Sequence, residues 1–118
     1  MTKKEIAKSF SEGKFKPNYQ FLSDKLIWEI IGEGENIFSG KGDIIDYCTQ
    51  IGKYFESVKT DFKTLNVIEG KSKIAVNGTA KFIRENETIN FTQSCDIYEF
   101  DKDGNVEKIT SYCIAKRN

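Results

Sequence analysis

The sequence has 118 residues, of which 38% are apolar and 13% aromatic, enough for one domain with a core and a lined cavity. Its 18 basic residues balance 18 acidic ones and are interspersed with them, which argues against a surface for nucleic acid. It contains no histidine, so Ser-His-Asp and Cys-His catalytic groups and histidine-based metal sites are excluded. We therefore expect a single domain over residues 1–118, and the sequence indicates no metal and no cofactor.

Residues 3–12 are predicted to form a helix, because Thr2 and Glu5 fit a capping box ahead of an apolar stripe. Pro17 can begin a second short helix. The apolar run 26–31 is typical of a mostly buried strand, and a glycine-rich connection follows it.

The second half begins with a predicted helix over 43–58, where apolar residues recur at spacings of three and four. Beyond it the period changes to two, and short turns separate four predicted strands, 60–69, 72–84, 88–100 and 105–116. Helices in the first half and strands in the second predict an α+β fold, with the helices on one face of an antiparallel meander.

No segment has the apolar run that a signal peptide or a membrane span needs, so we expect a cytoplasmic protein with no membrane partner. Cys48, Cys95 and Cys113 are an odd number without CxxC spacing, and we expect three reduced thiols. If Phe100 pairs with Val106, Cys95 and Cys113 are diagonal on one face of the last hairpin. A bulge at Gly104 would put them on opposite faces, and neither arrangement suits a disulfide.

Asp96 is the notable polar residue of these strands. On the two-residue period of a strand it shares a face with Ser94, Tyr98 and Phe100. A carboxylate among aromatic side chains is either paired with a cation, solvated on an open face, or held in a pocket with a raised pKa.

Trp28, the single tryptophan, shares a face of its strand with Leu26 and Ile30. It is either part of the core or part of a cavity wall. A shift of one residue would turn Glu29 inward instead.

The stretch 96–106, DIYEFDKDGNV, resembles a hairpin of the nuclear transport factor 2 superfamily, and 28–32 and 39–42 resemble two of its shorter segments. The order of predicted elements is similar to the SnoaL-like and ketosteroid-isomerase-like branches. The resemblance implies a curved antiparallel sheet wrapped on about three N-terminal helices, forming a cone with an internal cavity. It also implies a homodimer through the outer sheet face, where Phe91, Cys95 and Ile97 would lie.

In ketosteroid isomerases a pocket aspartic acid on this hairpin donates to the oxyanion, and its position falls on Asp96. The positions of the catalytic tyrosine and the general base fall on Ile6 and Ile30, so the isomerase mechanism is not predicted. The resemblance implies that Asp96 faces the cavity with a raised pKa, as an acid/base group or an oxyanion donor.

Two functions fit these observations. The first is a small-molecule-binding domain or SnoaL-like enzyme, whose mainly apolar cavity would take an apolar or carbonyl-containing molecule. The expected aromatic and aliphatic lining is Trp28, Ile30, Tyr54, Phe55 and Tyr98, and the expected polar lining is Ser94, Asp96, Ser111 and Cys113. The second is a dimeric protein-interaction module without catalytic activity, whose interior is filled by its own side chains.

Overall fold

The computed structural model describes residues 1–32 and 36–117, and these form three helices and six strands. The helices are α1 (Lys3–Ser11), the 3-10 helix η1 (Lys16–Phe21) and α2 (Lys41–Glu56). The strands are β1 (Leu22–Gly32), β2 (Asn36–Ser39), β3 (Lys59–Glu69), β4 (Lys73–Arg84), β5 (Glu87–Phe100) and β6 (Val106–Arg117).

The strands form one mixed sheet in the order β2-β1-β6-β5-β4-β3. The expected antiparallel meander comprises β3 to β6, and β2 pairs antiparallel with β1. The pairing of β1 with β6 is parallel, which corrects the expectation of a wholly antiparallel sheet. A parallel pair needs a long crossover, and α2 with the first three strands of the meander provides it.

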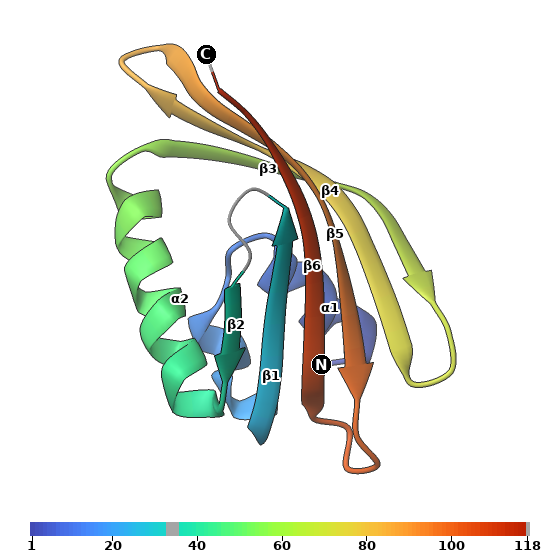
Figure 1. Cartoon of the computed structure of the whole chain (residues 1–118). Coiled ribbons are helices and arrows are strands. Elements are labelled where there is room, and N and C mark those ends of the chain that lie inside the picture. Colours follow the sequence, from blue (N-terminus) through green and yellow to red (C-terminus); the bar gives the residue numbers. More distant parts are fainter. Residues whose placement is uncertain (33–35, 118) are drawn as a thin grey trace.

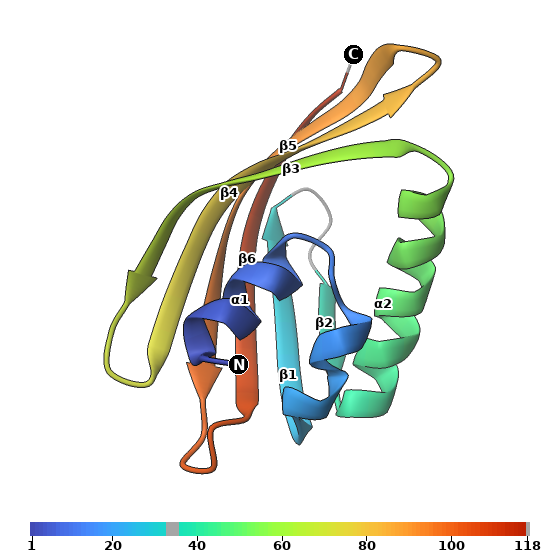
Figure 2. The same cartoon turned by 180° about the vertical axis from the view of Figure 1, so that it is seen from behind.

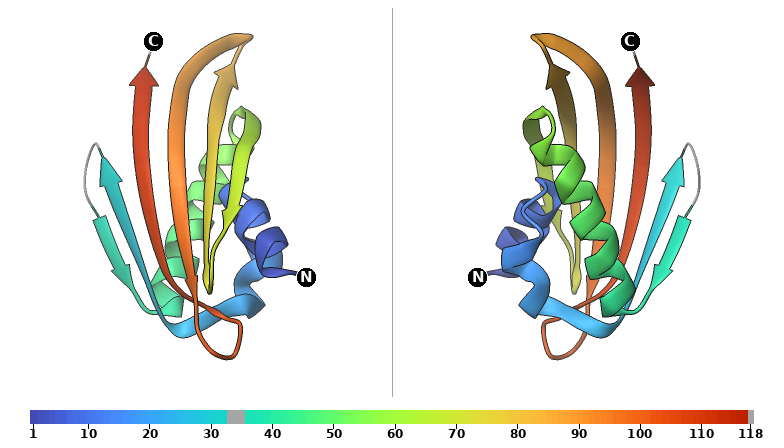
Figure 3. Two further views of the ribbon diagram at one scale, coloured as in Figure 1. Left: turned by 90° about the vertical axis from the view of Figure 1, so that its right-hand side faces the viewer. Right: turned by 90° about the vertical axis from the view of Figure 1, so that its left-hand side faces the viewer.

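All three helices lie on the concave side of the strongly curved sheet (Figures 1 and 2). α1 packs on β4 and β3, whereas α2 packs on β1 and β2 near the other edge. Figure 3 shows how β3 to β6 bend over the helices and close one side of the cone. The predicted α+β cone is therefore confirmed. None of the helices among the described residues is long and apolar enough to cross a membrane.

The ends of the elements follow local chemistry. The capping box of α1 is present, with Thr2 N donating to Glu5 Oε1 over 3.0 Å and Glu5 N donating to Thr2 Oγ1 over 3.1 Å. β1 begins at Leu22, earlier than the apolar run suggested. The short strand β2 lies inside the expected glycine-rich connection, most of its side chains are exposed, and its apolar signal is correspondingly weak. Residues 33–35 of that connection lie outside the described residues.

One irregularity between β5 and β6 decides which side chains face inward. Phe100 pairs with Val106, but Glu99 pairs with Lys108, so Glu107 is an additional residue in β6. This bulge shifts the register by one residue, as a bulge at Gly104 would have done. Cys95 and Cys113 consequently lie on opposite faces of the sheet.

Candidate functional site

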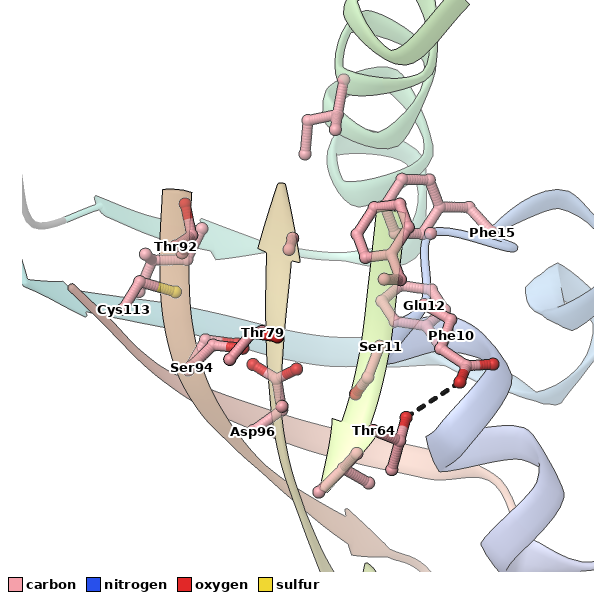
Figure 4. A pocket seen from close by; sticks show the side chains of 18 of the residues that line it. Phe10, Ser11, Glu12, Phe15, Thr64, Thr79, Thr92, Ser94, Asp96 and Cys113 are labelled. Carbon is pink, nitrogen blue, oxygen red and sulfur yellow. Dashed lines mark hydrogen bonds between the residues drawn. The ribbon is translucent and has the colours of Figure 1, made fainter. Parts of the chain in front are cut away.

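A cavity of about 290 Å³ lies between the concave face of the sheet and the helices (Figure 4). Its walls are mainly apolar and aromatic, with rings from α1, β1, α2, β3, β4 and β5. The carboxyl groups among its lining residues belong to Asp96 and Glu12. Such a composition is typical of a pocket in which apolar area gives affinity and a few polar groups give orientation.

Asp96 points into the cavity from the middle of β5 (Figure 4). The sheet register places Val76 of β4 on one side of it and Ser111 of β6 on the other, with Ile30 of β1 opposite Ser111. All four residues line the cavity. They form one row across four strands, and Asp96 is the ionisable member of that row.

The neighbouring row supplies two aromatic side chains with polar tips. Trp28 and Tyr98 are both paired with Ile109 of β6 and are buried. Trp28 Nε1 donates a hydrogen bond to Ser111 Oγ over 2.9 Å. The Tyr98 hydroxyl is 2.7 Å from Ser11 Oγ, at the end of α1. Ser111 on β6 and Ser11 at the end of α1 therefore both lie at the end of the cavity that contains Asp96. Each is hydrogen-bonded to one aromatic side chain.

Burial raises the pKa of Asp96 above its ordinary value, and hydrogen bonds from Ser111 and Ser11 offset part of that rise. None of the ion pairs between described residues includes Asp96. The pKa of Tyr98 is raised well above its usual value, first by burial and then by the charge of Asp96. Tyr98 therefore remains a protonated phenol.

Glu12, the second carboxyl group of the cavity lining, has the opposite shift. Thr64 Oγ1 donates to Glu12 Oε2 over 2.9 Å (Figure 4). Lys8 Nζ lies 3.0 Å from the same oxygen. Burial acts to raise the pKa of Glu12, but the hydrogen bonds from Lys8 and Thr64 bring it below its ordinary value. Glu12 is thus an ionised group that ties α1 to β3, whereas Asp96 is the carboxyl group that retains its proton more readily.

Comparison of the sequence with models of protein families and with curated proteins finds no match. A solved structure from Cytophaga hutchinsonii, an NTF2-like protein of unknown function, matches with a TM-score of 0.81 and 32% sequence identity. The match covers 93% of this chain and 94% of that chain. The chain belongs to the NTF2-like family.

More distant solved structures share the fold alone. A protein from Kribbella flavida, provisionally assigned as a ketosteroid isomerase, matches 98% of this chain and 80% of its own, with 10% identity and a TM-score of 0.73. A protein from Sinorhizobium meliloti, provisionally assigned as a polyketide cyclase, matches 91% of this chain and 93% of its own, with 10% identity and a TM-score of 0.62.

Most residues expected to line the NTF2-like cavity do lie along it, namely Trp28, Ile30, Ser94, Asp96, Tyr98, Ser111 and Cys113. Trp28 faces inward, and Glu29 belongs to the opposite face of β1. Tyr54 and Phe55 lie outside the cavity lining. Tyr47 and Ile51, on earlier turns of α2, line the cavity instead, whereas Phe55 stacks on Phe15 and Phe82 beside it.

Sequence reasoning missed the contribution of the end of α1 to this NTF2-like cavity. Ser11 and Glu12 line it, together with Phe10. A signal for Ser11 was present, because it follows Ala7 by four residues and so continues the buried stripe of the helix. A polar residue on an apolar stripe needs a hydrogen-bond partner, and Ser11 finds Tyr98.

The cysteines are poor nucleophiles in this NTF2-like chain. All three are free, and burial raises the pKa of Cys48 to about 12 and that of Cys113, with a further contribution from Asp96, to about 11. A thiol with such a pKa is almost entirely protonated near neutral pH. Over residues 1–32 and 36–117, no cluster of three or more cysteine, aspartate or glutamate residues has the arrangement of a metal site.

Proposed function

We propose that this NTF2-like domain binds a small, mainly apolar molecule that carries a hydrogen-bond acceptor such as a carbonyl oxygen. The observation that carries the proposal is Asp96, a carboxyl group in an apolar cavity with a raised pKa and without a cationic partner among the described residues. A carboxyl group in such surroundings gains from keeping its proton and donating it to an uncharged acceptor.

Asp96 is the residue that would act on the ligand. As a neutral acid it would donate a hydrogen bond to a carbonyl oxygen and stabilise negative charge developing there. Trp28, Ile30, Ser94, Tyr98, Ser111 and Cys113 would form the wall around the ligand. The relatives provisionally assigned as an isomerase and a cyclase support an enzyme of this class as the more specific form of the proposal.

The size of the cavity favours a ligand of one or two rings. About 290 Å³ lies just below the range of roughly 300–1,000 Å³ that is usual for small-molecule pockets. A suitable probe is therefore 1-tetralone, a bicyclic ketone, with the hydrocarbon tetralin as its matched partner that lacks the acceptor. Tetralin offers no acceptor to the proton of neutral Asp96, so it should bind more weakly than 1-tetralone.

The proposal is tested by calorimetric titration of the protein with both probes. We expect 1-tetralone to bind more tightly than tetralin, and its affinity to fall as the pH rises through the pKa of Asp96, because only the neutral acid donates. Asp96→Asn should bind the ketone without this pH dependence, since an amide donates at every pH. Equal binding of the two probes would reject the role of Asp96, and binding of neither would leave the protein-interaction module as the better interpretation.

We also propose that two copies pair through the outer sheet face, in the cytosol. Ile37, Ile27, Tyr112 and Ile114 are exposed on that face, and Phe91, Cys95 and Ile97 are half-buried beside them. A sheet with helices on one side leaves such a surface in water unless a partner covers it. A second copy presents the same apolar surface, and the net formal charge of zero gives no long-range repulsion between copies.

A further inference from the structure

The two serine hydroxyls beside Asp96 are each held by an aromatic side chain, and one of these two contacts has a fixed direction. The indole N–H of Trp28 is a donor and never an acceptor, so its 2.9 Å hydrogen bond occupies a lone pair of Ser111 Oγ. The hydrogen of Ser111 remains available. Asp96 is directly opposite Ser111 in the sheet, the Ser111 hydroxyl lowers the pKa of Asp96, and we assign that hydrogen to its carboxyl group.

The direction of the second contact follows from burial. Tyr98 has 1% of its surface exposed, and Ser11 is the hydrogen-bond partner of its hydroxyl within the described part of the chain. A buried O–H group without an acceptor is costly, whereas an oxygen with an unused lone pair is less so. Tyr98 therefore donates to Ser11, and the hydrogen of Ser11 is left to go to Asp96.

We propose that Trp28 and Tyr98 are positioning residues, which orient Ser111 and Ser11 as donors to Asp96 so that the proton of the neutral carboxyl group points into the cavity. The inference rests on the proposed function and deepens it, because it states where the proton of neutral Asp96 points. In each of these two contacts the serine hydrogen lies between the two oxygens, so the carboxyl proton does not occupy that contact. The carboxyl proton is then directed toward the cavity, where an acceptor on the ligand can take it.

Other titratable groups surround the cavity and belong to several elements. They are Glu12 at the end of α1, Tyr47 on α2, Lys63 on β3, Tyr98 on β5 and Cys113 on β6. Glu12 is bonded to Lys8 and Thr64, and the Lys63 side chain is exposed. Cys95, next to Asp96 in the sequence, belongs to the other face of β5. The side chains that lower the pKa of Asp96 are those of Ser111 and Ser11.

The test measures the pKa of Asp96 in the ligand-free protein by carbon-detected NMR. Trp28→Phe and Tyr98→Phe each remove a polar group while keeping an aromatic ring. If both serines donate to Asp96, both substitutions weaken a hydrogen bond to the ionised form, and the pKa of Asp96 rises in both variants. In the opposite orientation neutral Asp96 donates to Ser11 and Ser11 donates to Tyr98. Tyr98→Phe would then lower the pKa.

The sign of the shift in Tyr98→Phe therefore decides the direction of the second contact, and a fall or no change overturns the proposal. If a variant does not fold, Ser111→Ala and Ser11→Ala serve instead, with Ser111→Thr and Ser11→Thr as controls that retain the hydroxyl. The alanine variants should raise the pKa of Asp96 and the threonine variants should restore it. A change in the pKa of Asp96 that came from altered packing alone would not be reversed by threonine.

Failure of the inference and failure of the proposed function remain distinguishable, because the NMR titration uses no ligand. Upward pKa shifts without any binding of 1-tetralone would support the inference and reject the proposed ligand. Tight, pH-dependent binding of 1-tetralone with a downward shift in Tyr98→Phe would support the proposed ligand and reject the inference.

Discussion

Asp96 on β5 lies directly opposite Ser111 on β6, and both side chains line the cavity. A carboxyl group in a mainly apolar wall is destabilising when ionised, and Ser111 lowers that cost without removing it. The stability of the whole domain is therefore linked to the protonation of one residue in the cavity.

Asp96→Asn is expected to stabilise the protein at neutral pH. The folded protein holds the Asp96 proton more tightly than the unfolded chain, so the stability contributed by the neutral acid is full below about pH 4 and is lost as the pH rises through the folded pKa. Asparagine is nearly isosteric and carries no charge. We expect its melting temperature to exceed that of the wild type at about pH 7 and to equal it at about pH 4. Calorimetry with Asp24→Asn, an exposed control, checks this, and equal melting curves for all three at neutral pH would contradict it.

Glu12→Gln is expected to have the opposite pH dependence. Its pKa is lowered in the folded protein, so its stabilising contribution is present above the unfolded pKa and is lost as the pH falls through the folded one. We expect a loss of about 1 kcal/mol at neutral pH, the usual size for a partly exposed ion pair with an added hydrogen bond. Urea unfolding at about pH 7 and pH 3 measures it, and an equal loss at both values would show that the charge is not the cause.

The sequence predicted the elements whose signal is local. The apolar stripe of α2 and the two-residue period of the meander each come from neighbouring residues, and α1 was marked by its own cap. The parallel pairing of β1 with β6 joins segments far apart in the sequence, and no local pattern encodes it. The inward position of Asp96 required both the strand period and a resemblance to the family hairpin. Glu12 joined the cavity only because α1 packs on β3, which is a tertiary contact.

Ile114→Glu is expected to convert the proposed homodimer into a monomer. Ile114 is 68% exposed in the single chain, and a buried carboxylate without a partner at a dimer interface would be strongly unfavourable. Gln50→Glu adds the same charge on the exposed side of α2 and should leave the assembly unchanged. Analytical ultracentrifugation at micromolar concentration compares the three proteins. A monomeric wild type would refute the proposed interface.

Alkylation rates are expected to distinguish Cys48 and Cys113, on the helix side of the sheet, from Cys95 on its outer face. Cys48 and Cys113 should react slowly with iodoacetamide at about pH 8 in every variant, because burial raises the pKa of their thiols to about 12 and about 11. Cys95 lies on the outer face opposite Tyr112, where a second copy would cover it. Mass spectrometry should find Cys95 modified faster in Ile114→Glu than in the wild type. The same rate in both would argue that Cys95 is not covered.

The bulge at Glu107 also bears on how the gene can change. Loss of that one codon would remove only the unpaired residue, so Glu99 would still face Lys108 and Asp96 would still face Ser111. Loss of one codon within the paired part of β6, between Lys108 and Cys113, would instead move the following residues by one position and turn their side chains to the other face of the sheet. We therefore expect relatives that keep this cavity to vary in length between Phe100 and Lys108 more readily than between Lys108 and Cys113.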